Sequence, residues 1–211
     1  MKQAIFFDLD GTLRNALEEL TESWNFAMEK NNLHYRFDTK MMQSCMGLTP
    51  LETVKLFFSD VDEKTGLKYF KICFDEEIKY LAKHPGKLYP HEEKVIAELS
   101  KNYDLYVVSN ADVGYIDNYL VACKMGKYFK GSLCAGDTNL DKSENIKLLK
   151  NKEHIDQVIY VGDTKKDMEQ TLLAGAEFIH ASYGFGEIDN PPHKINNLDE
   201  LIETINSVFI K

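Results

Sequence analysis

The chain has 211 residues, of which 44% are hydrophobic and 28% charged, and its formal net charge is −9. This length allows one large domain or two small ones, and this composition is that of a globular protein that can bury a core. No stretch approaches the ~20 consecutive apolar residues that a membrane-spanning helix needs. A strongly acidic chain also binds the nucleic-acid phosphate backbone poorly. We therefore expect neither a membrane nor a nucleic acid as a partner.

The N-terminal segment MKQAIFFDLDGTL has an apolar run that Asp8 and Asp10 interrupt, unlike the apolar region of a secretory signal peptide. The four cysteines form no CxxC pair, so we expect reduced thiols and no zinc site or disulfide framework. Together these features predict a cytoplasmic protein. The HExxH, GxSxG, GxxxxGK(S/T) and GxGxxG motifs are absent, which argues against a zincin, a serine hydrolase, a P-loop protein and a dinucleotide fingerprint.

Short apolar runs that end in polar or glycine-containing sequence predict buried strands at residues 4–7, 105–108, 132–135, 158–161 and 178–181. Helical patterns at about 90–101, 113–123, 143–152 and 165–174 lie between or before them, each long enough for a crossover between parallel strands. A surface helix is expected at 197–209. This alternation predicts an α/β protein with a Rossmann-like parallel sheet, helices on both faces, and a functional crevice at the carboxyl ends of the strands.

Residues 14–84 contain no good strand pattern, and apolar spacings of three and four residues predict several helices there. Asp10-Gly11-Thr12 on one side and Pro85-Gly86 on the other are typical of linkers. We therefore expect a discontinuous catalytic core, residues 1–14 plus 86–211, with an inserted helical cap, residues 15–85. Such a cap would act as a lid over the strand ends.

Polar side chains follow four of the predicted strands: Asp8 and Asp10, Ser109 and Asn110, Lys142, and Asp163 and Asp167. In a parallel sheet all of these positions lie at one edge. Several carboxylates in one pocket repel each other unless a cation lies among them, and hard oxygen ligands suit Mg²⁺. The sequence therefore predicts a magnesium site that lets an acidic protein hold a phosphate, with Lys142 as a second positive charge.

The spacing of Asp8 and Asp10 suits a division of labour in phosphoryl transfer, and Gly11 permits the turn between strand and site. One carboxylate attacks phosphorus to give an aspartyl-phosphate. Its neighbour protonates the leaving oxygen and then deprotonates the attacking water. The Ser109 hydroxyl and the backbone N–H groups of Asp10, Gly11 and Asn110 could donate to the phosphoryl oxygens.

Four ordered segments, DLDGTL at 8–13, VVSN at 107–110, Lys142, and GDTKKD at 162–167, resemble the motifs of the haloacid dehalogenase superfamily. The helical insertion between the first two resembles the type-one cap of that superfamily. Within it, the chain is similar to the branch of phosphoglycolate phosphatases and β-phosphoglucomutases.

That resemblance implies a role for each motif residue. Asp8 would be the nucleophile and a metal ligand, and Asp10 the acid/base, which also gives the metal its backbone carbonyl. Asp163 would be a further ligand, and Asp167 either a ligand or the residue that holds Lys142 in place. Thr12 and Asn110 would support the phosphate and the loop geometry.

Some positions depart from the pattern of the superfamily. Arg14-Asn15 follows the first motif where relatives often carry an Asp-Ser or Asp-Thr pair, and Ser143 replaces the usual proline after Lys142. Mutases of this branch carry a cap histidine soon after the acid/base aspartate, and here Glu18-Glu19-Leu20 occupies that region. This difference counts against a mutase.

We therefore predict a magnesium-dependent phosphatase that hydrolyses a small phosphorylated metabolite, phosphoglycolate or a sugar phosphate, through an aspartyl-phosphate. The alternatives are a phosphomutase and a non-catalytic regulatory protein of the same fold. We expect a monomer or a homodimer.

Three smaller predictions concern residues outside the motifs. Gly184-Phe185-Gly186 predicts a turn that needs positive φ. Trp24 is expected in the core of the cap, with Phe26 or Met46 as candidates to face the substrate. Lys40 and Lys55 are expected to be solvated.

Overall fold

The computed structural model describes residues 1–209. Its centre is a six-stranded parallel sheet in the order β5-β4-β1-β6-β7-β8. The strands are β1 (Gln3–Phe7), β4 (Asp104–Ser109), β5 (Gly131–Cys134), β6 (Gln157–Gly162), β7 (Glu177–Ala181) and β8 (Lys194–Ile195). The five predicted strands are thus confirmed to within one residue at each end. The sequence did not predict β8, because a two-residue strand leaves no periodicity to detect.

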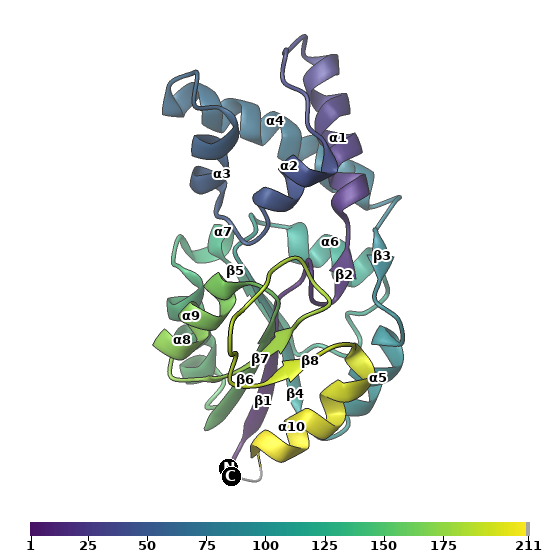
Figure 1. The fold of residues 1–211 in the computed structure, drawn as a ribbon, viewed down its shortest axis with the longest axis vertical. Coiled ribbons are helices and arrows are strands. Elements are labelled where there is room, and N and C mark those ends of the chain that lie inside the picture. The colour runs from purple at the N-terminus through teal and green to yellow at the C-terminus, as the bar shows by residue number, and fades with distance from the viewer. Residues whose placement is uncertain (210–211) are drawn as a thin grey trace.

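Helices cover both faces of this sheet (Figure 1). They are α5 (Glu92–Leu99), α6 (Tyr115–Ala122), α7 (Ala135–Thr138), α8 (Lys142–Lys152), α9 (Lys165–Leu173) and α10 (Leu201–Phe209), with a 3-10 turn η1 at Leu198–Glu200. Figure 1 shows α8 and α9 on one side of the sheet and α5 and α10 on the other. The predicted Rossmann-like α/β fold is confirmed.

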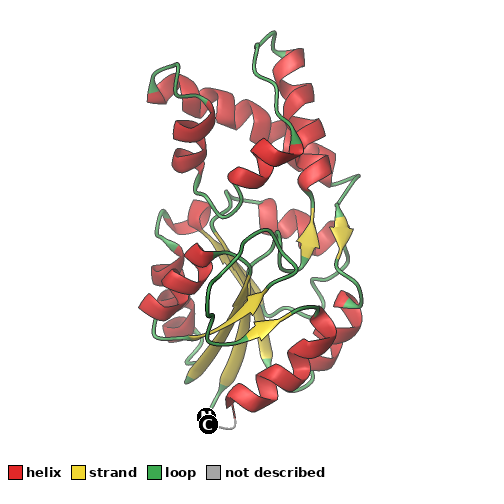
Figure 2. Ribbon diagram, in the orientation of Figure 1, coloured by secondary structure: helices red, strands yellow, loops and turns green. Residues whose placement is uncertain are grey.

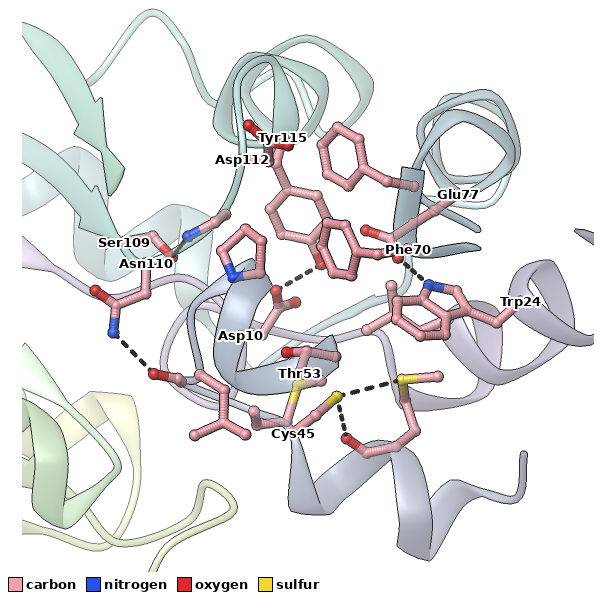
Figure 3. A pocket seen from close by; sticks show the side chains of 18 of the residues that line it. Asp10, Trp24, Cys45, Thr53, Phe70, Glu77, Ser109, Asn110, Asp112 and Tyr115 are labelled. Atoms are coloured by element: carbon pink, nitrogen blue, oxygen red, sulfur yellow. Dashed lines mark hydrogen bonds between the residues drawn. The ribbon is translucent and has the colours of Figure 1, made fainter. Parts of the chain in front are cut away.

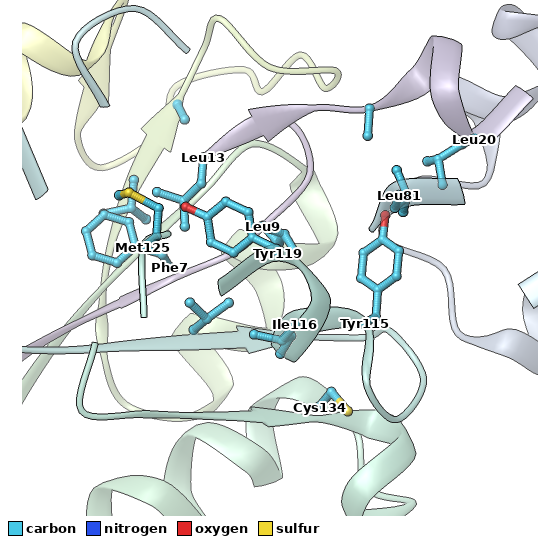
Figure 4. Packing of buried hydrophobic residues seen from close by; sticks show 14 of the residues in the cluster. Phe7, Leu9, Leu13, Leu20, Leu81, Tyr115, Ile116, Tyr119, Met125 and Cys134 are labelled. Carbon is cyan, nitrogen blue, oxygen red and sulfur yellow. The ribbon is translucent and has the colours of Figure 1, made fainter. Parts of the chain in front are cut away.

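Alternation along the strands divides the core into two layers. Ile5 and Phe7 of β1 belong to the cluster that α5 and α10 cover, whereas Ala4 and Phe6 belong to the cluster under α8. Successive side chains of a strand point to opposite faces, so a strand buried on both sides reads as a continuous apolar run. Figure 4 shows part of the first cluster, where Phe7 lies near Tyr119 of α6.

Residues 17–81 form four helices above the carboxyl ends of the strands (Figure 2), and we call them the helical insertion. They are α1 (Leu17–Lys30), α2 (Thr39–Ser44), α3 (Pro50–Phe57) and α4 (Glu63–Leu81). Trp24 is buried among them and makes edge-to-face contacts with Phe37, Phe57 and Phe70. The insertion therefore has a hydrophobic core of its own, with Trp24 at its centre as predicted.

A short antiparallel pair joins the two ends of the insertion. Strand β2 (Arg14–Asn15) pairs with β3 (Lys87–Leu88), which the sequence did not predict. Strand β2 straddles the expected boundary at residues 14–15, and β3 begins one residue after the boundary at 85–86. The division into core and cap stays a prediction. Within residues 1–209, no helix combines the length and the apolar character needed to cross a bilayer.

Candidate active site

Four buried charged side chains meet at the carboxyl edge of the sheet. Asp8 follows β1, Lys142 begins α8, Asp163 follows β6, and Asp167 lies in the first turn of α9. Carboxylate oxygens of the three aspartates lie within 4.8 Å of one another. Residues far apart in sequence therefore converge as expected, because parallel strands bring their carboxyl ends to one edge.

Helix capping fixes two members of this cluster. The Asp141 side chain accepts from Glu144 N and starts α8, which places Lys142 in its first turn. Thr164 and Asp167 form a capping box at the start of α9, where Asp167 Oδ2 accepts from Thr164 N at 3.0 Å and Thr164 Oγ1 at 2.6 Å. Each cap satisfies backbone N–H groups that a helix start leaves free. Helix α8 thus begins at Lys142 without the proline that usually follows this lysine.

Lys142 is the cation of the cluster. Its Nζ donates to Asp8 Oδ1 at 3.0 Å and also to Asp167 Oδ1, and the side chain is 1% exposed. Both oxygens of Asp167 are therefore engaged, one with Lys142 and the other in the capping box. Of the two roles that the resemblance implied for Asp167, the observed contact is the one that holds Lys142.

Asp163 has an oxygen without a partner. Its Oδ2 accepts from Phe185 N at 2.7 Å, whereas Oδ1 is buried and has no hydrogen bond from any described residue. Leaving a buried polar atom unpaired is costly, so such an atom usually has a partner that binds there. Three carboxylates, one of which has a buried unpaired oxygen, are a donor set that fits a hard divalent cation.

The turn that carries Phe185 differs from its prediction. Gly184 and Gly186 do not have positive φ; the glycines that do are Gly11, Gly47, Gly86, Gly114 and Gly175. Gly184 is instead needed for space, because a Cβ there would lie 2.3 Å from Asp163 Cβ and 2.4 Å from Gly11 O. Contact distances this short exclude any side chain at residue 184. The prediction that this turn needs positive φ was therefore wrong, and glycine is required there because neighbouring atoms lie too close for a Cβ.

The cluster is short of positive charge. Burial, together with the Asp167 charge, raises the pKa of Asp8 to about 7 although Lys142 opposes the shift. Burial and the charges of Asp167 and Asp8 raise the pKa of Asp163 well above its ordinary value. Burial disfavours the charged form of Lys142, yet the Asp167 and Asp8 carboxylates raise its pKa above the ordinary value. A bound cation would relieve this excess of carboxylates.

The Asp10 side chain points away from this cluster. Arg14 Nε donates to its Oδ1 at 3.0 Å, and Tyr115 OH donates to its Oδ2 at 2.6 Å. Arg14 is fully buried and lies over the Tyr115 ring, 5.0 Å from the ring centroid. The expected metal contact of Asp10, through its backbone carbonyl, stays a prediction. Arg14 and Tyr115 were not predicted as site residues. The only sign in the sequence was that Arg14-Asn15 departs from the pattern of the superfamily.

A cavity of about 100 Å³ lies between the helical insertion and the sheet edge (Figure 3). Its lower wall includes Asp8, Asp10, Ser109, Asn110 and Tyr115, and its upper wall includes Leu20, Trp24, Met46, Phe70, Phe74 and Glu77. The structure therefore brings Ser109 and Asn110 beside the two aspartates of the first motif, as expected. It does not bring Gly11 or Thr12 to the cavity wall; Thr12 is buried, and its carbonyl accepts from Tyr183 OH at 2.9 Å.

Of the smaller predictions about the insertion, those for Met46, Lys40 and Lys55 agree with the structure, and that for Phe26 does not. Met46 lines the cavity, whereas Phe26 is 52% exposed and does not. Lys40 and Lys55 are exposed, as expected. Glu77 was not predicted, because a glutamate in the acidic run Asp75-Glu76-Glu77 of an amphipathic helix gives no sign of facing inward.

The insertion also contacts the core beside the cavity. Asn110 Nδ2 donates to Gly47 O at 2.8 Å, and Lys166 Nζ donates to both carboxylate oxygens of Glu52, at 2.8 and 2.6 Å. A predicted phosphate-site residue is thus tied directly to the loop between α2 and α3.

Comparison with known proteins places this site in a family. The sequence profile of haloacid dehalogenase-like hydrolases matches residues 5–181, a span that holds all four motifs. The chain belongs to this family. The resemblance read from the motifs is confirmed.

Relatives of this hydrolase include a phosphoglycolate phosphatase from Haemophilus influenzae, which is 26% identical over an alignment that covers 86% of each chain. A structure described as a predicted phosphatase from Clostridium acetobutylicum has a TM-score of 0.80, with 24% identity, and covers 98% of this chain and 99% of its own. A β-phosphoglucomutase from Clostridium difficile has a TM-score of 0.77 at 15% identity, with full coverage of both chains. The predicted enzyme class, a phosphoric monoester hydrolase, agrees with the family and with the named phosphatases.

Proposed function

We propose that this hydrolase is a magnesium-dependent phosphatase that releases phosphate from a small phosphorylated metabolite through an aspartyl-phosphate at Asp8. One observation carries the proposal: Asp8, Asp163 and Asp167 gather their buried carboxylates around one ammonium, Lys142, which pairs with Asp8 and Asp167. Asp8 also lines the cavity, together with Asp10. Carboxylates gathered in this way suit a cation and a phosphoryl group together.

Asp8, Asp163 and the backbone carbonyl of Asp10 are the groups that would hold the metal. The unpaired Asp163 Oδ1 supports this choice. Bound Mg²⁺ supplies positive charge that offsets the charge of the phosphoryl oxygens. Asp167 already contacts Lys142, so we assign it to positioning that ammonium beside Asp8.

In the first half of the reaction, the phosphoryl group is transferred from the substrate to Asp8. A carboxylate oxygen of Asp8 forms the new bond to phosphorus while the bond from phosphorus to the ester oxygen breaks. Asp10 donates its proton to that leaving oxygen, so an alcohol departs. Ser109 Oγ and the backbone N–H of Asn110 donate to the phosphoryl oxygens, and Lys142 balances the charge near Asp8.

The second half regenerates the free enzyme. Asp10, now a carboxylate, accepts a proton from water as the water oxygen bonds to phosphorus. The bond between phosphorus and Asp8 breaks, and inorganic phosphate leaves. Arg14 and Tyr115 contact one oxygen of Asp10 each, so Asp10 releases at least one of these contacts to exchange a proton with the ester oxygen or the water. We assign residues 15–85 the role of a cap that excludes bulk water during these steps.

The substrate class rests on the relatives. Curated relatives are named phosphoglycolate phosphatases, which supports a small phosphorylated metabolite as substrate. The test is phosphate release from a panel of phosphorylated metabolites with Mg²⁺, using Asp8→Asn as the nucleophile variant and Asp117→Asn, at an exposed position of α6, as the matched control. Asp8→Asn should lose at least about a thousandfold in rate, and Asp117→Asn should match the wild type.

The same panel separates the alternatives. An isomeric phosphate ester without stoichiometric free phosphate would identify a phosphomutase, and no turnover of any ester would identify a regulatory protein. Full activity of Asp8→Asn would contradict the nucleophile assignment. Removal of metal with EDTA should abolish activity, and an unaffected rate would contradict the magnesium requirement.

A further inference from the structure

The cavity above Asp8 contains no basic side chain among the described residues that line it. Its charged lining residues are Asp8, Asp10, Glu77 and Asp112. Lys142 and Arg14 are fully buried beneath the lower wall and are paired with Asp8 and Asp10. A substrate that brings a second anionic group into this cavity would therefore meet acidic and apolar groups and no counter-charge.

Among the described residues, Glu77 is the acidic side chain of the upper wall. It lies in α4, is 5% exposed, and its Oε2 accepts a hydrogen bond from Trp24 Nε1. That is the single hydrogen bond that the carboxyl group makes within residues 1–209, so Oε1 is free to accept from a ligand. Figure 3 shows Glu77 and Trp24 facing the cavity beside Phe70.

The surroundings of Glu77 favour a ligand that donates. Burial disfavours the charged form of Glu77 and raises its pKa to about 8, although Trp24 opposes the shift, so an ammonium or another donor would stabilise the carboxylate. Most of the remaining upper wall is apolar or aromatic, and it includes Leu20, Met46, Leu48, Phe70 and Phe74. Aromatic rings next to a carboxylate also suit an ammonium group.

We propose that Glu77 selects phosphate esters whose leaving alcohol is not anionic and carries a hydrogen-bond donor, an amine or a hydroxyl, on a short carbon frame. The donor binds Glu77 Oε1 while the phosphate lies at Asp8. A carboxylate at the same place has no cation to pair with, and the ionised form of Glu77 repels it. This inference rests on the proposed phosphatase function and separates this chain from relatives named for phosphoglycolate.

The test is a set of esters of similar size: phosphoethanolamine, ethylene glycol monophosphate, propyl phosphate and phosphoglycolate. Phosphate release with Mg²⁺ gives kcat and KM for each. We expect kcat/KM for the amine and hydroxyl esters to exceed that for phosphoglycolate by at least about tenfold. Propyl phosphate should fall between, because it neither binds Glu77 nor is repelled by it.

Glu77→Gln removes the charge and keeps an oxygen that can accept from Trp24. We expect it to reduce the preference for phosphoethanolamine over phosphoglycolate by at least about tenfold, mainly through KM. Glu76→Gln is the matched control, since Glu76 contacts Lys30 at 3.1 Å and does not line the cavity. Its preference should equal that of the wild type.

A second variant leaves Glu77 intact. Met46→Arg places a cation on a partly exposed position of the cavity wall and should raise kcat/KM for phosphoglycolate relative to phosphoethanolamine. Preference of the wild type for phosphoglycolate, or an unchanged preference in both Glu77→Gln and Met46→Arg, would overturn the inference. p-Nitrophenyl phosphate separates the two levels: if neither it nor any ester of the set is hydrolysed, the phosphatase proposal itself fails.

Discussion

Arg14 Nε lies 3.0 Å from Asp10 Oδ1, and the arginine side chain is fully buried. The same guanidinium donates through Nη1 to Pro85 O at 3.2 Å, while Nη2 has no hydrogen-bond partner within residues 1–209. Arg14 belongs to β2, which pairs with β3 at the base of the helical insertion. The proposed acid/base residue is therefore held by the segment through which the chain enters the insertion.

Replacing Arg14 with alanine should reduce both stability and turnover. The change leaves the partly buried Asp10 without its counter-charge, and loss of one partner of a buried ion pair costs about 3–5 kcal/mol. Tyr115→Phe keeps the ring and removes only the donor to Asp10 Oδ2, so it should cost about 1 kcal/mol. Urea unfolding and kcat for phosphate release measure both effects. Equal losses of stability in the two variants would show that the ion pair with Arg14 stabilises the protein no more than the hydrogen bond from Tyr115.

Lys142→Met tests the charge balance of the carboxylate cluster. Without metal, we expect it to lower the free energy of unfolding by about 3–5 kcal/mol, because Asp8 and Asp167 lose their shared ammonium. Lys147→Met on the same helix removes an exposed pair with Glu144 and should cost less than about 1 kcal/mol. Thermal unfolding with and without Mg²⁺ is the measurement. Mg²⁺ should stabilise Lys142→Met, and a variant as stable as the wild type in EDTA would refute the charge argument.

Gly184→Ala should disturb the site by steric conflict. Its Cβ would lie within 2.3 Å of Asp163 Cβ, so the Asp163 carboxylate must shift, and activity should fall together with stability. Gly175 offers the converse case: its φ is +68°, and a Cβ at this position would have no other atom of residues 1–209 within 4 Å, so Gly175→Ala meets backbone strain alone. That strain costs roughly 1–2 kcal/mol. Gly175→Ala should keep the wild-type kcat, whereas an active Gly184→Ala enzyme would show that the close approach is dispensable.

Glu92 gives a pH-dependent contribution to stability. It is buried, accepts from Tyr119 OH, and burial raises its pKa from 4.5 to about 8. A carboxyl group whose pKa is raised on folding contributes its stability below the unfolded pKa and loses it as the pH rises through the folded value. The loss therefore falls between pH 4.5 and about 8.

Glu92→Gln cannot ionise, so its free energy of unfolding should rise relative to the wild type as the pH increases through that window. Each unit of pKa shift corresponds to about 1.4 kcal/mol, so the relative gain should reach a few kcal/mol. Glu93→Gln is the neighbouring control, because the Glu93 carboxylate is exposed and hydrogen bonds from Lys127 and Tyr128 lower its pKa. Urea unfolding at several pH values decides the matter: parallel curves for Glu92→Gln and the wild type would show that Glu92 does not titrate there.

Much of the fold and of the proposed site could be predicted from the sequence. A strand buried on both faces is a continuous apolar run in the sequence. The strands that end at Phe7, Ser109 and Gly162 could therefore be located from these runs. Parallel strands share one carboxyl edge, so residues that follow them must meet. For that reason Asp8, Asp163 and Lys142 were predicted together before any distance was known.

Only the tertiary structure decided which groups those residues contact. Tyr115 is 105 residues from Asp10, and no periodicity links them. Glu76 and Glu77 are adjacent in sequence, yet the packing of α4 against α1 turns Glu77 to Trp24 and the cavity and leaves Glu76 with Lys30. Local patterns determine the secondary structure, and with it which residues lie at the shared carboxyl edge of the sheet. The direction of a single side chain depends on long-range packing, which no local pattern encodes.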